Sequence, residues 1–386
     1  MDGKFIQRIK SVVLSIKLYF MKNILLKGFF GYNNLGDDLL LKEALSKYPQ
    51  DVNLFVCWPR NAIKELQYFQ KYHPFTPIYG IKDLFTHFYD AVIWSGGGVF
   101  PLRFFLFENY VKMLPYRILS RKMVLNGIGI VEKPKRKWFD CFLRLVDYCS
   151  VRDNKSLDFV SSQIQAINCG DLYWGANQHV GEANLKNSKR LLVCLANPFS
   201  DQELQSKSVS ERFEKLILQC VDFIKKYKQI GYEVNYLPFY HGSDEKFINR
   251  VQDKLHSNDK VLQRDIDYDL DTIDELFHQY EFGLCMRFHS ILLSIKNSLP
   301  IVAIEYDFKS EMLMKEAGLG KFGVRYGIRK SDFFGEEFDI DGDRLCTIAD
   351  VLQEERDAFK LKSKSFAQLK HQQVLDNYKN IFRLLL

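Results

Sequence analysis

The stretch GLCMRFHSILLSIKNSLPIVAIEYDFK, residues 283–309, decides the fold. It contains an apolar strand that runs into Cys285, an apolar helix with the sequence SILLSI, and a second strand, PIVAIEY. A strand, a helix and another strand in this order predict a parallel βαβ unit. The junction of the first strand and the helix carries Arg287 and His289. A packed core does not favour two such side chains, so we expect them to serve a ligand.

The same alternation extends toward both ends of the chain. Strands followed by helices recur from residue 21, and a polar linker at 181–190 precedes a second series. The pattern predicts an α/β protein with two Rossmann-like domains. We place the N-terminal domain at 21–185 and the C-terminal domain at 186–355. Residues 356–386 are predicted to form a C-terminal helix that packs back on the N-terminal domain.

Composition narrows the class of protein. The 386 residues are 47% hydrophobic and 26% charged, which is typical of a soluble globular protein. The eight cysteines form no CxxC pair, so we expect reduced thiols, no zinc site and a cytoplasmic protein. No segment resembles a signal peptide or reaches the length of a membrane-spanning helix.

Basic residues are concentrated in the first part of the chain. Residues 1–150 carry 22 Lys and Arg against 12 Asp and Glu, whereas 151–386 carry 32 against 36. Residues 1–20 predict a basic amphipathic helix, which is typical of segments that lie on an anionic membrane surface. Packing on the protein's own core or at a dimer contact explains the same pattern equally well. The basic residues do not form a recognisable nucleic-acid-binding module.

Glycine-rich turns follow several predicted strands, where parallel sheets bind ligands. In the turn at 28–38, Gly31, Asn33, Asn34 and Gly36 lead into a helix. Such a turn exposes backbone N–H groups to an anion or a sugar hydroxyl. The next two residues, Asp37 and Asp38, are candidates for a general base or for the helix N-cap, which Asp favours.

Two further turns have the same position. Gly96, Gly97 and Gly98 follow a strand, and three successive glycines favour close approach of a ligand to the backbone. Arg152 follows another strand and precedes Asp153, which is predicted to cap the next helix. Taken alone, Arg152 and Asp153 also suit a surface ion pair.

The opening stretch supplies the fourth candidate site. In an extended segment Arg287 and His289 lie on one face, so we expect guanidinium and imidazole to project together. A guanidinium holds carboxylate or phosphate, and an imidazole transfers protons near neutral pH. Lys309 is expected at the end of the following strand, on the same rim. The rim therefore suits a small molecule with two anionic groups.

These motifs together resemble the polysaccharide pyruvyl transferase family. A glycine and asparagine loop before GDD, a strand ending in SGGG, a VRD step, an R-x-H pair and a Y-D-x-K sequence occur in order between about residues 22 and 320. The family's usual GDE is GDD here, which leaves the first carboxylate intact. The resemblance implies two domains facing across a cleft, as in the GT-B glycosyltransferase architecture.

The resemblance also implies an activity. Members transfer pyruvate from phosphoenolpyruvate to a sugar of a surface polysaccharide, exopolysaccharide or capsule, forming a cyclic ketal. The expected acceptor is a glycan on polyprenyl diphosphate, with the enzyme cytoplasmic or peripheral on the inner membrane face. No metal or cofactor is expected besides phosphoenolpyruvate as co-substrate. The implied catalytic residues are Asp37, Arg287 and His289, and the implied donor-binding residues add Arg152 and Lys309.

Two other functions fit parts of the pattern. A glycosyltransferase that uses a nucleotide sugar shares the expected fold, and Glu305 or Asp307 would suit its ribose. A catalytically inert glycan-binding or scaffold protein is the second alternative. Such a module has no need for Asp37, Arg152, Arg287 and His289 together, so the sequence favours an enzyme.

Overall fold

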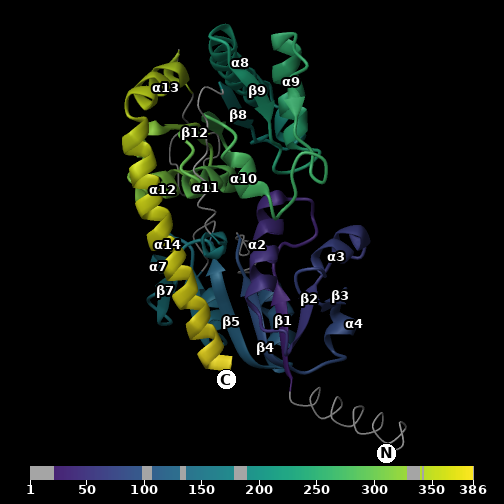
Figure 1. The fold of residues 1–386 in the computed structure, drawn as a ribbon. Coiled ribbons are helices and arrows are strands. Elements are labelled where there is room, and N and C mark those ends of the chain that lie inside the picture. The colour runs from purple at the N-terminus through teal and green to yellow at the C-terminus, as the bar shows by residue number, and fades with distance from the viewer. Residues whose placement is uncertain are drawn as a thin grey trace, which may run out of the picture.

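The fold consists of two parallel β-sheets, each covered by helices, one above the other (Figure 1). The computed structural model describes residues 21–97, 107–130, 136–177, 189–327, 340 and 343–385. The predicted amphipathic helix at 1–20 and the candidate residue Gly98 lie outside these ranges.

The first sheet has seven strands in the order β3-β2-β1-β4-β5-β6-β7, and each neighbouring pair is parallel. Its strands are β1 (Lys22–Lys27), β2 (Val52–Cys57), β3 (Phe75–Ile78), β4 (Tyr89–Ser95), β5 (Ser120–Ile128), β6 (Tyr148–Val151) and β7 (Ala166–Asn168). The connecting helices are α2 (Leu35–Lys47), α3 (Ile63–Phe69), α4 (Ile81–Leu84), α5 (Phe107–Ile118), α6 (Arg136–Leu143), α7 (Asn154–Val160) and the 3₁₀ turn η2 (Leu172–Gly175).

The second sheet has six strands in the order β10-β9-β8-β11-β12-β13, again all parallel. They are β8 (Arg190–Cys194), β9 (Glu233–Tyr236), β10 (Lys260–Val261), β11 (Phe282–Cys285), β12 (Ile301–Glu305) and β13 (Gly323–Arg325). The helices are η3 (Glu203–Gln205), α8 (Lys207–Gln229), α9 (Asp244–Leu255), α10 (Ile273–Phe277), α11 (Phe288–Lys296), α12 (Phe308–Glu316), η4 (Gly320–Phe322), α13 (Arg344–Glu354) and α14 (Arg356–Leu385).

The strands are apolar on both faces because helices cover both faces of each sheet. Every residue of β11 and β12 is buried, and β4 is buried at all positions but one. The prediction of an α/β fold with two Rossmann-like domains is confirmed by this topology. The order of the first six strands is that of doubly wound nucleotide-binding sheets, in which ligands bind outside the carboxyl ends of the strands.

The sheets are joined by polar contacts as well as by packing. The Leu35 amide donates to the Phe239 carbonyl at 2.8 Å, which ties the start of α2 to the loop after β9. On the other side of α2, the Tyr173 hydroxyl donates to Asp274 Oδ2 at 3.0 Å. Lys296 pairs with the same carboxylate at 2.9 Å, and both side chains are buried. These contacts fix the carboxyl end of the first sheet against the second.

The C-terminal helix α14 runs along both halves of the molecule (Figure 1). Its Asn377 amide donates to Asn126 Oδ1 at 2.7 Å and accepts from the Tyr148 hydroxyl at 2.9 Å, both in the first sheet. His371 makes a hydrogen bond of 2.8 Å with the Trp174 carbonyl. The stretch predicted as the C-terminal helix forms a single helix of 30 residues. None of the helices in the described ranges has the length and hydropathy of a membrane span.

Candidate functional site

The turn after β1 positions the first candidate residues. Gly31 and Asn33 have positive φ angles of 78° and 55°, which turn the chain sharply. Asn34 then caps α2, because its side chain accepts a hydrogen bond of 3.1 Å from the Gly36 amide. The interpretation of Asp37 or Asp38 as the N-cap is therefore wrong. Asp37 lies in the first turn of α2.

Gly36 contacts His289 from the opposite sheet. A Cβ atom at position 36 would overlap the imidazole Nδ1, so only glycine allows the ring to lie against this backbone. His289 is in the first turn of α11 and its side chain is 13% exposed. The close approach brings a residue of the second sheet to the start of α2. The glycine at this position is thus required by the site and not by the turn alone.

Asp171 lies on the other side of the His289 ring, and the sequence did not single it out. Its Oδ2 is 3.7 Å from His289 Nε2, and its Oδ1 accepts from the Tyr173 amide at 3.0 Å. Burial opposes ionisation of Asp171, but His289 and Arg152 outweigh burial and hold the pKa of this carboxyl below its usual value. Asp171 is the third residue after β7, so the Gly-Asp step close to a strand end was the available signal.

Arg152 reaches the same carboxylate from the end of β6. Its Nη1 is 4.0 Å from Asp171 Oδ2 and its Nε is 3.6 Å from Asp153 Oδ2. The residue is only 6% exposed, so the interpretation of a surface ion pair is wrong. Asp153 caps α7 at 2.7 Å, as predicted. The Nε and Nη2 atoms of Arg152 are buried and lack a hydrogen-bond partner, which leaves two donors for a ligand.

Lys309 and Phe288 lie beside Arg152 and Asp171. Lys309 is in the first turn of α12, with its Nζ 3.3 Å from Asp307 Oδ2 and its side chain 26% exposed. The Phe288 ring stacks on the Arg152 guanidinium at 4.8 Å. Arg152, Asp171, Phe288 and Lys309 all line one small cavity. We call Asp37, Arg152, Asp171, His289 and Lys309 the cleft cluster.

The cleft cluster changes the acidity of Asp37. Burial raises the pKa of its carboxyl to about 6, and the neighbouring Asp171 adds to the rise. His289, Lys309 and Arg152 limit the rise electrostatically. Gly97, with a φ of 72°, passes close to this carboxyl, since a Cβ there would lie 3.2 Å from Asp37 Oδ1. Asp37 is consequently a carboxylate at neutral pH that accepts a proton readily.

The remaining candidates of the first domain have structural partners. Asp38 is buried and pairs with Arg264 of the second domain at 2.8 Å. Burial nonetheless raises the pKa of Asp38 to about 7. Gly96, with a φ of 65°, packs on Leu40.

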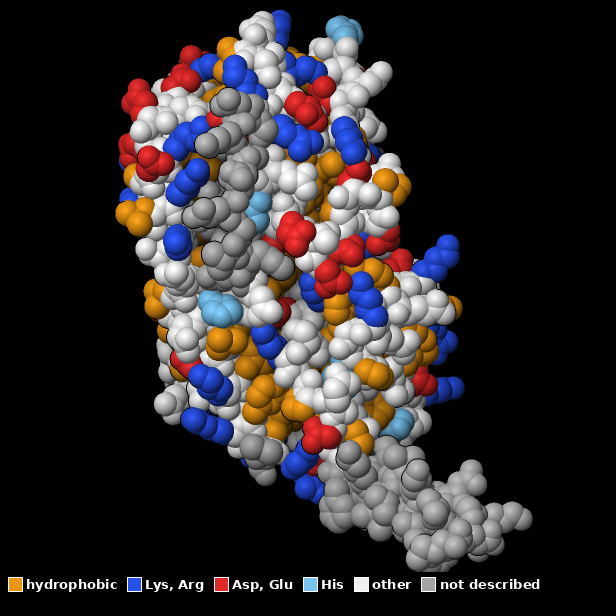
Figure 2. All heavy atoms as spheres, viewed as in Figure 1, with side chains coloured by type: hydrophobic (Ala, Val, Ile, Leu, Met, Phe, Trp, Pro, Cys, Tyr) orange, Lys and Arg blue, Asp and Glu red, His pale blue; other side chains and the backbone are white. Residues whose placement is uncertain are grey.

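On the face drawn in Figure 2, acidic and basic side chains gather along the boundary between the two halves of the molecule.

Arg287 has a different environment from the one predicted. The expected extended segment is wrong, because α11 begins at Phe288 and Arg287 is its N-cap. The guanidinium pairs with the buried Asp244 at 2.5 and 3.1 Å and with the Tyr306 hydroxyl at 3.2 Å. Asp244 in turn accepts from the Phe239 and Tyr240 amides. Burial disfavours the charge of Arg287, but Tyr306 and Asp244 outweigh it and raise its pKa. Arg287 thus holds the loop after β9.

This pairing predicts a loss of stability when Arg287 is replaced. The variant Arg287→Ala leaves the Asp244 carboxylate buried and unpaired, which costs about 3–5 kcal/mol of unfolding free energy. Urea unfolding followed by circular dichroism measures this change. The double variant Arg287→Ala/Asp244→Asn should recover part of the loss. An Arg287→Ala protein as stable as the wild type contradicts the assignment.

Metal ligation finds no support in the described ranges. No group of three or more His, Cys, Asp or Glu side chains there has the geometry to hold an ion. The cationic side chains of the cleft cluster are Arg152 and Lys309.

Comparisons with known proteins identify the family and the fold of the chain. Residues 34–308 match the model of the family described as polysaccharide pyruvyl transferase. No curated protein is significantly similar in sequence to the chain. Among solved structures, Anabaena Alr3699/HepE in complex with UDP-glucose superposes with a TM-score of 0.57 at 14% identity, covering 94% of this chain and 99% of that chain.

Two other structures have the same fold. Staphylococcus aureus MnaA with UDP gives a TM-score of 0.54 at 12% identity, covering 89% of this chain and 91% of its own. A glycosyltransferase from Rickettsia africae gives 0.55 at 11% identity, covering 94% and 99%. The architecture is therefore that of GT-B glycosyltransferases and related epimerases. The family match covers most of the chain and contains every residue of the cleft cluster but Lys309, so the protein is a transferase that belongs to the polysaccharide pyruvyl transferase family.

Proposed function

We propose that the protein transfers pyruvate from phosphoenolpyruvate to a sugar of a surface polysaccharide or its lipid-linked precursor. The product is a cyclic pyruvate ketal, and inorganic phosphate is released. The observation that carries the proposal is the cleft cluster, in which two cationic side chains, an imidazole beside a carboxylate and a second carboxylate converge between the sheets. Phosphoenolpyruvate carries both a carboxylate and a phosphate, so it suits a site with Arg152 and Lys309.

The reaction needs two protons donated, one to C3 and one to the departing phosphate, and two protons removed from the acceptor hydroxyls. Protonation of C3 converts the enol carbon pair into a methyl group and an electrophilic C2. A sugar hydroxyl then adds to C2 and loses its proton, and the C2–O bond to phosphate breaks. A second hydroxyl of the same sugar adds to C2 and loses its proton, which closes the ring. The bonds broken and formed balance without an oxidant or a reductant.

The side chains of the cleft cluster have matching roles in this sequence. His289 donates the proton to C3, and Asp171 orients the ring and stabilises its protonated form. Arg152 holds the anionic donor through its two unpaired donors. Lys309 neutralises the phosphate as it leaves. Asp37 removes the proton of an acceptor hydroxyl.

The acidity of Asp37 predicts the acid limb of the pH profile. Because the base must be ionised, kcat/KM should fall as the pH drops through about 6. Lys309 lowers the pKa of Asp37, so Lys309→Met should move the limb to higher pH. The control Lys364→Met, on the exposed side of α14, should leave the limb in place. A limb that does not move in Lys309→Met contradicts the role of Asp37.

The experiment that tests the proposal is phosphate release from phosphoenolpyruvate with a panel of acceptors. The panel contains galactosides, N-acetylhexosamine derivatives and their polyprenyl diphosphate forms. Release that depends on an acceptor supports the proposal. Thermal stabilisation by phosphoenolpyruvate in the absence of an acceptor is the second measurement. Failure of both contradicts the proposal.

One observation favours a second candidate, a glycosyltransferase that uses a nucleotide sugar. Two proteins with the same fold were solved with UDP-glucose or UDP. Stabilisation of this protein by nucleotide sugars, together with none by phosphoenolpyruvate, would favour the glycosyltransferase. The opposite result favours the pyruvyl transferase.

The sequence of residues 1–20 is the basis on which we propose a lipid-linked acceptor and a position on the inner membrane face. A basic amphipathic segment binds anionic vesicles through its apolar face and its lysines. Deletion of residues 1–20 should lower binding to vesicles of anionic phospholipid about 10-fold or more. Activity on a water-soluble acceptor should change far less. Equal vesicle binding by both proteins contradicts the membrane proposal.

A further inference from the structure

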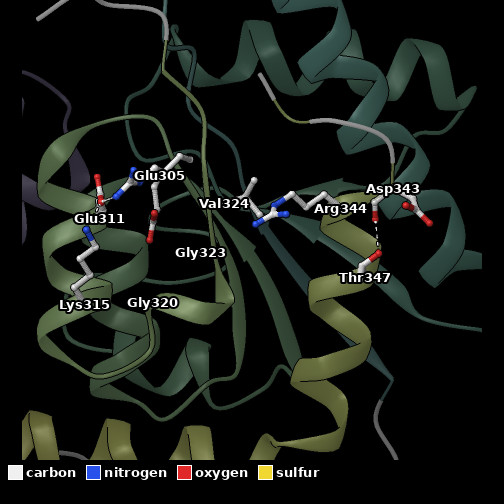
Figure 3. A pocket seen from close by; sticks show the side chains of 10 residues that line it. Glu305, Glu311, Lys315, Gly320, Gly323, Val324, Asp343, Arg344 and Thr347 are labelled. Carbon is white, nitrogen blue, oxygen red and sulfur yellow. Dashed lines mark hydrogen bonds and ion pairs between the residues drawn. The ribbon is translucent and has the colours of Figure 1, made fainter. Parts of the chain in front are cut away.

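A large cavity among the described residues lies in the second domain, outside the cleft cluster. It has a volume of about 680 Å³ and is bounded by β12, β13, α12 and α13. None of the five residues of the cleft cluster lines it. A volume of this size accommodates a small organic molecule. Figure 3 shows its acidic side chains Glu305 and Glu311 on one side and Arg344 opposite, on α13.

Glu305 is a buried acid of this cavity, and one of its two carboxyl oxygens lacks a hydrogen-bond partner. It is the last residue of β12 and is 3% exposed. Its Oε1 makes no hydrogen bond, and its carboxyl lies so close to Gly323 that a Cβ there would overlap it. A buried carboxyl oxygen without a hydrogen-bond partner is costly and calls for a ligand that supplies one.

Arg344 is the complementary group. It is exposed in the first turn of α13 and has no ion pair or hydrogen bond to a described side chain. Figure 3 shows its side chain extending from α13 toward the strand side of the cavity. The other two basic residues differ, because Lys315 and Arg325 both pair with Glu311. Among the described residues, no side chain therefore competes with an anion for the donors of Arg344.

The charges of the lining favour a monoanionic or dianionic ligand. The lining contains three basic residues, which are Lys315, Arg325 and Arg344, and two acidic residues besides Glu305, which are Glu311 and Asp343. The lining therefore carries one excess positive charge when Glu305 is protonated. Burial raises the pKa of Glu305 to about 7, and the like charge of Glu311 adds to the rise. Arg325 and Lys315 limit it. A protonated Glu305 donates one hydrogen bond and accepts others, which suits a hydroxyl group.

We propose that this cavity binds a phosphate monoester that carries a hydroxylated sugar ring. The phosphate lies on the Arg344 guanidinium, and a ring hydroxyl bonds the Glu305 carboxyl. Both a sugar phosphate and a nucleoside monophosphate have this chemistry. The site is separate from the cleft cluster, and it does not depend on phosphoenolpyruvate being the donor substrate.

Isothermal titration of the full-length protein tests the site with three probes. These are glucose 1-phosphate, uridine 5′-monophosphate and inorganic phosphate. We expect one or both sugar-bearing probes to bind at least about 10-fold more tightly than inorganic phosphate, since only they reach Glu305. The probe that binds identifies the source. Absence of binding by both at millimolar concentration overturns the proposal, as does equal affinity for inorganic phosphate.

Matched variants locate the binding. Arg344→Gln should weaken the bound probe at least about 10-fold, whereas Arg383→Gln on exposed α14 should leave it unchanged. Because Glu305 must be protonated, affinity should fall as the pH rises from 6 to 8, and Glu305→Gln should remove this dependence. Unchanged affinity in Arg344→Gln overturns the proposal. Displacement of the probe by phosphoenolpyruvate also overturns it, because the probe would then occupy the cleft cluster.

Discussion

Replacing His289 by Gln is expected to lower kcat/KM for phosphoenolpyruvate about 10³-fold, because the proton donor to C3 is lost. The ring lies between the Gly36 backbone and Asp171, with Nε2 3.7 Å from Asp171 Oδ2. Gln has a similar reach and keeps a hydrogen-bonding end, so the fold should persist. His87→Gln, at a partly buried histidine just before β4, is the matched control and should retain activity.

A second pair of variants separates the chemistry of His289 from its position. Gly36→Ala keeps the imidazole but forces it to move, so it should cost about 10²-fold in kcat/KM. Asp171→Asn keeps the ring in place but removes the carboxylate that stabilises its protonated form. The value of kcat should therefore fall, because proton transfer from the ring is less favourable. Steady-state kinetics between pH 5 and 9 measures both effects. Full activity in His289→Gln contradicts the assignment of the proton donor.

Replacing Arg152 by Lys is expected to lower kcat/KM for phosphoenolpyruvate about 10²- to 10³-fold, mainly through KM. Lysine keeps the positive charge near Asp171 but loses the planar fork whose Nε and Nη2 have no protein partner. It also loses the stacking contact with Phe288 at 4.8 Å. The variant Arg152→Lys therefore measures the contribution of bidentate hydrogen bonding separately from that of the positive charge.

Binding of phosphoenolpyruvate without an acceptor provides the direct readout for Arg152. The dissociation constant from calorimetry should rise in Arg152→Lys by a similar factor. The control Arg250→Lys changes an arginine that pairs with Glu214 outside the cleft cluster, and it should bind normally. An unchanged dissociation constant in Arg152→Lys would remove this residue from the donor site.

The fold was predictable from the sequence because its signals are local. Apolar runs such as those of β4 and β12, separated by helical segments, predict parallel sheets from short stretches of sequence alone. The candidate residues at strand ends were predictable for the same reason, since carboxyl ends of parallel strands meet at one edge. The approach of Gly36 to His289 follows from two such edges facing each other across the domains.

The pairings of individual side chains were not predictable, because they depend on contacts distant in sequence. Arg287 looked like a ligand-binding residue, yet its partner is Asp244, 43 positions earlier. Asp171 belongs to none of the sequence motifs described above. Its role follows only from the structure, in which His289 and Arg152 lie beside its carboxylate. Because α11 begins at Phe288, Arg287 and His289 do not lie together in an extended segment. Sequence patterns do not predict a helix boundary to within one or two residues.

The measurement that tests the account most directly is the mass spectrum of the acceptor after reaction in D₂O. In the proposed mechanism C3 takes its proton from His289, and the ring proton exchanges with solvent. The account predicts an acceptor that carries one pyruvate ketal with a single deuterium in its methyl group, formed in step with phosphate release. A product that carries a transferred sugar, or phosphate release without a ketal, would contradict it.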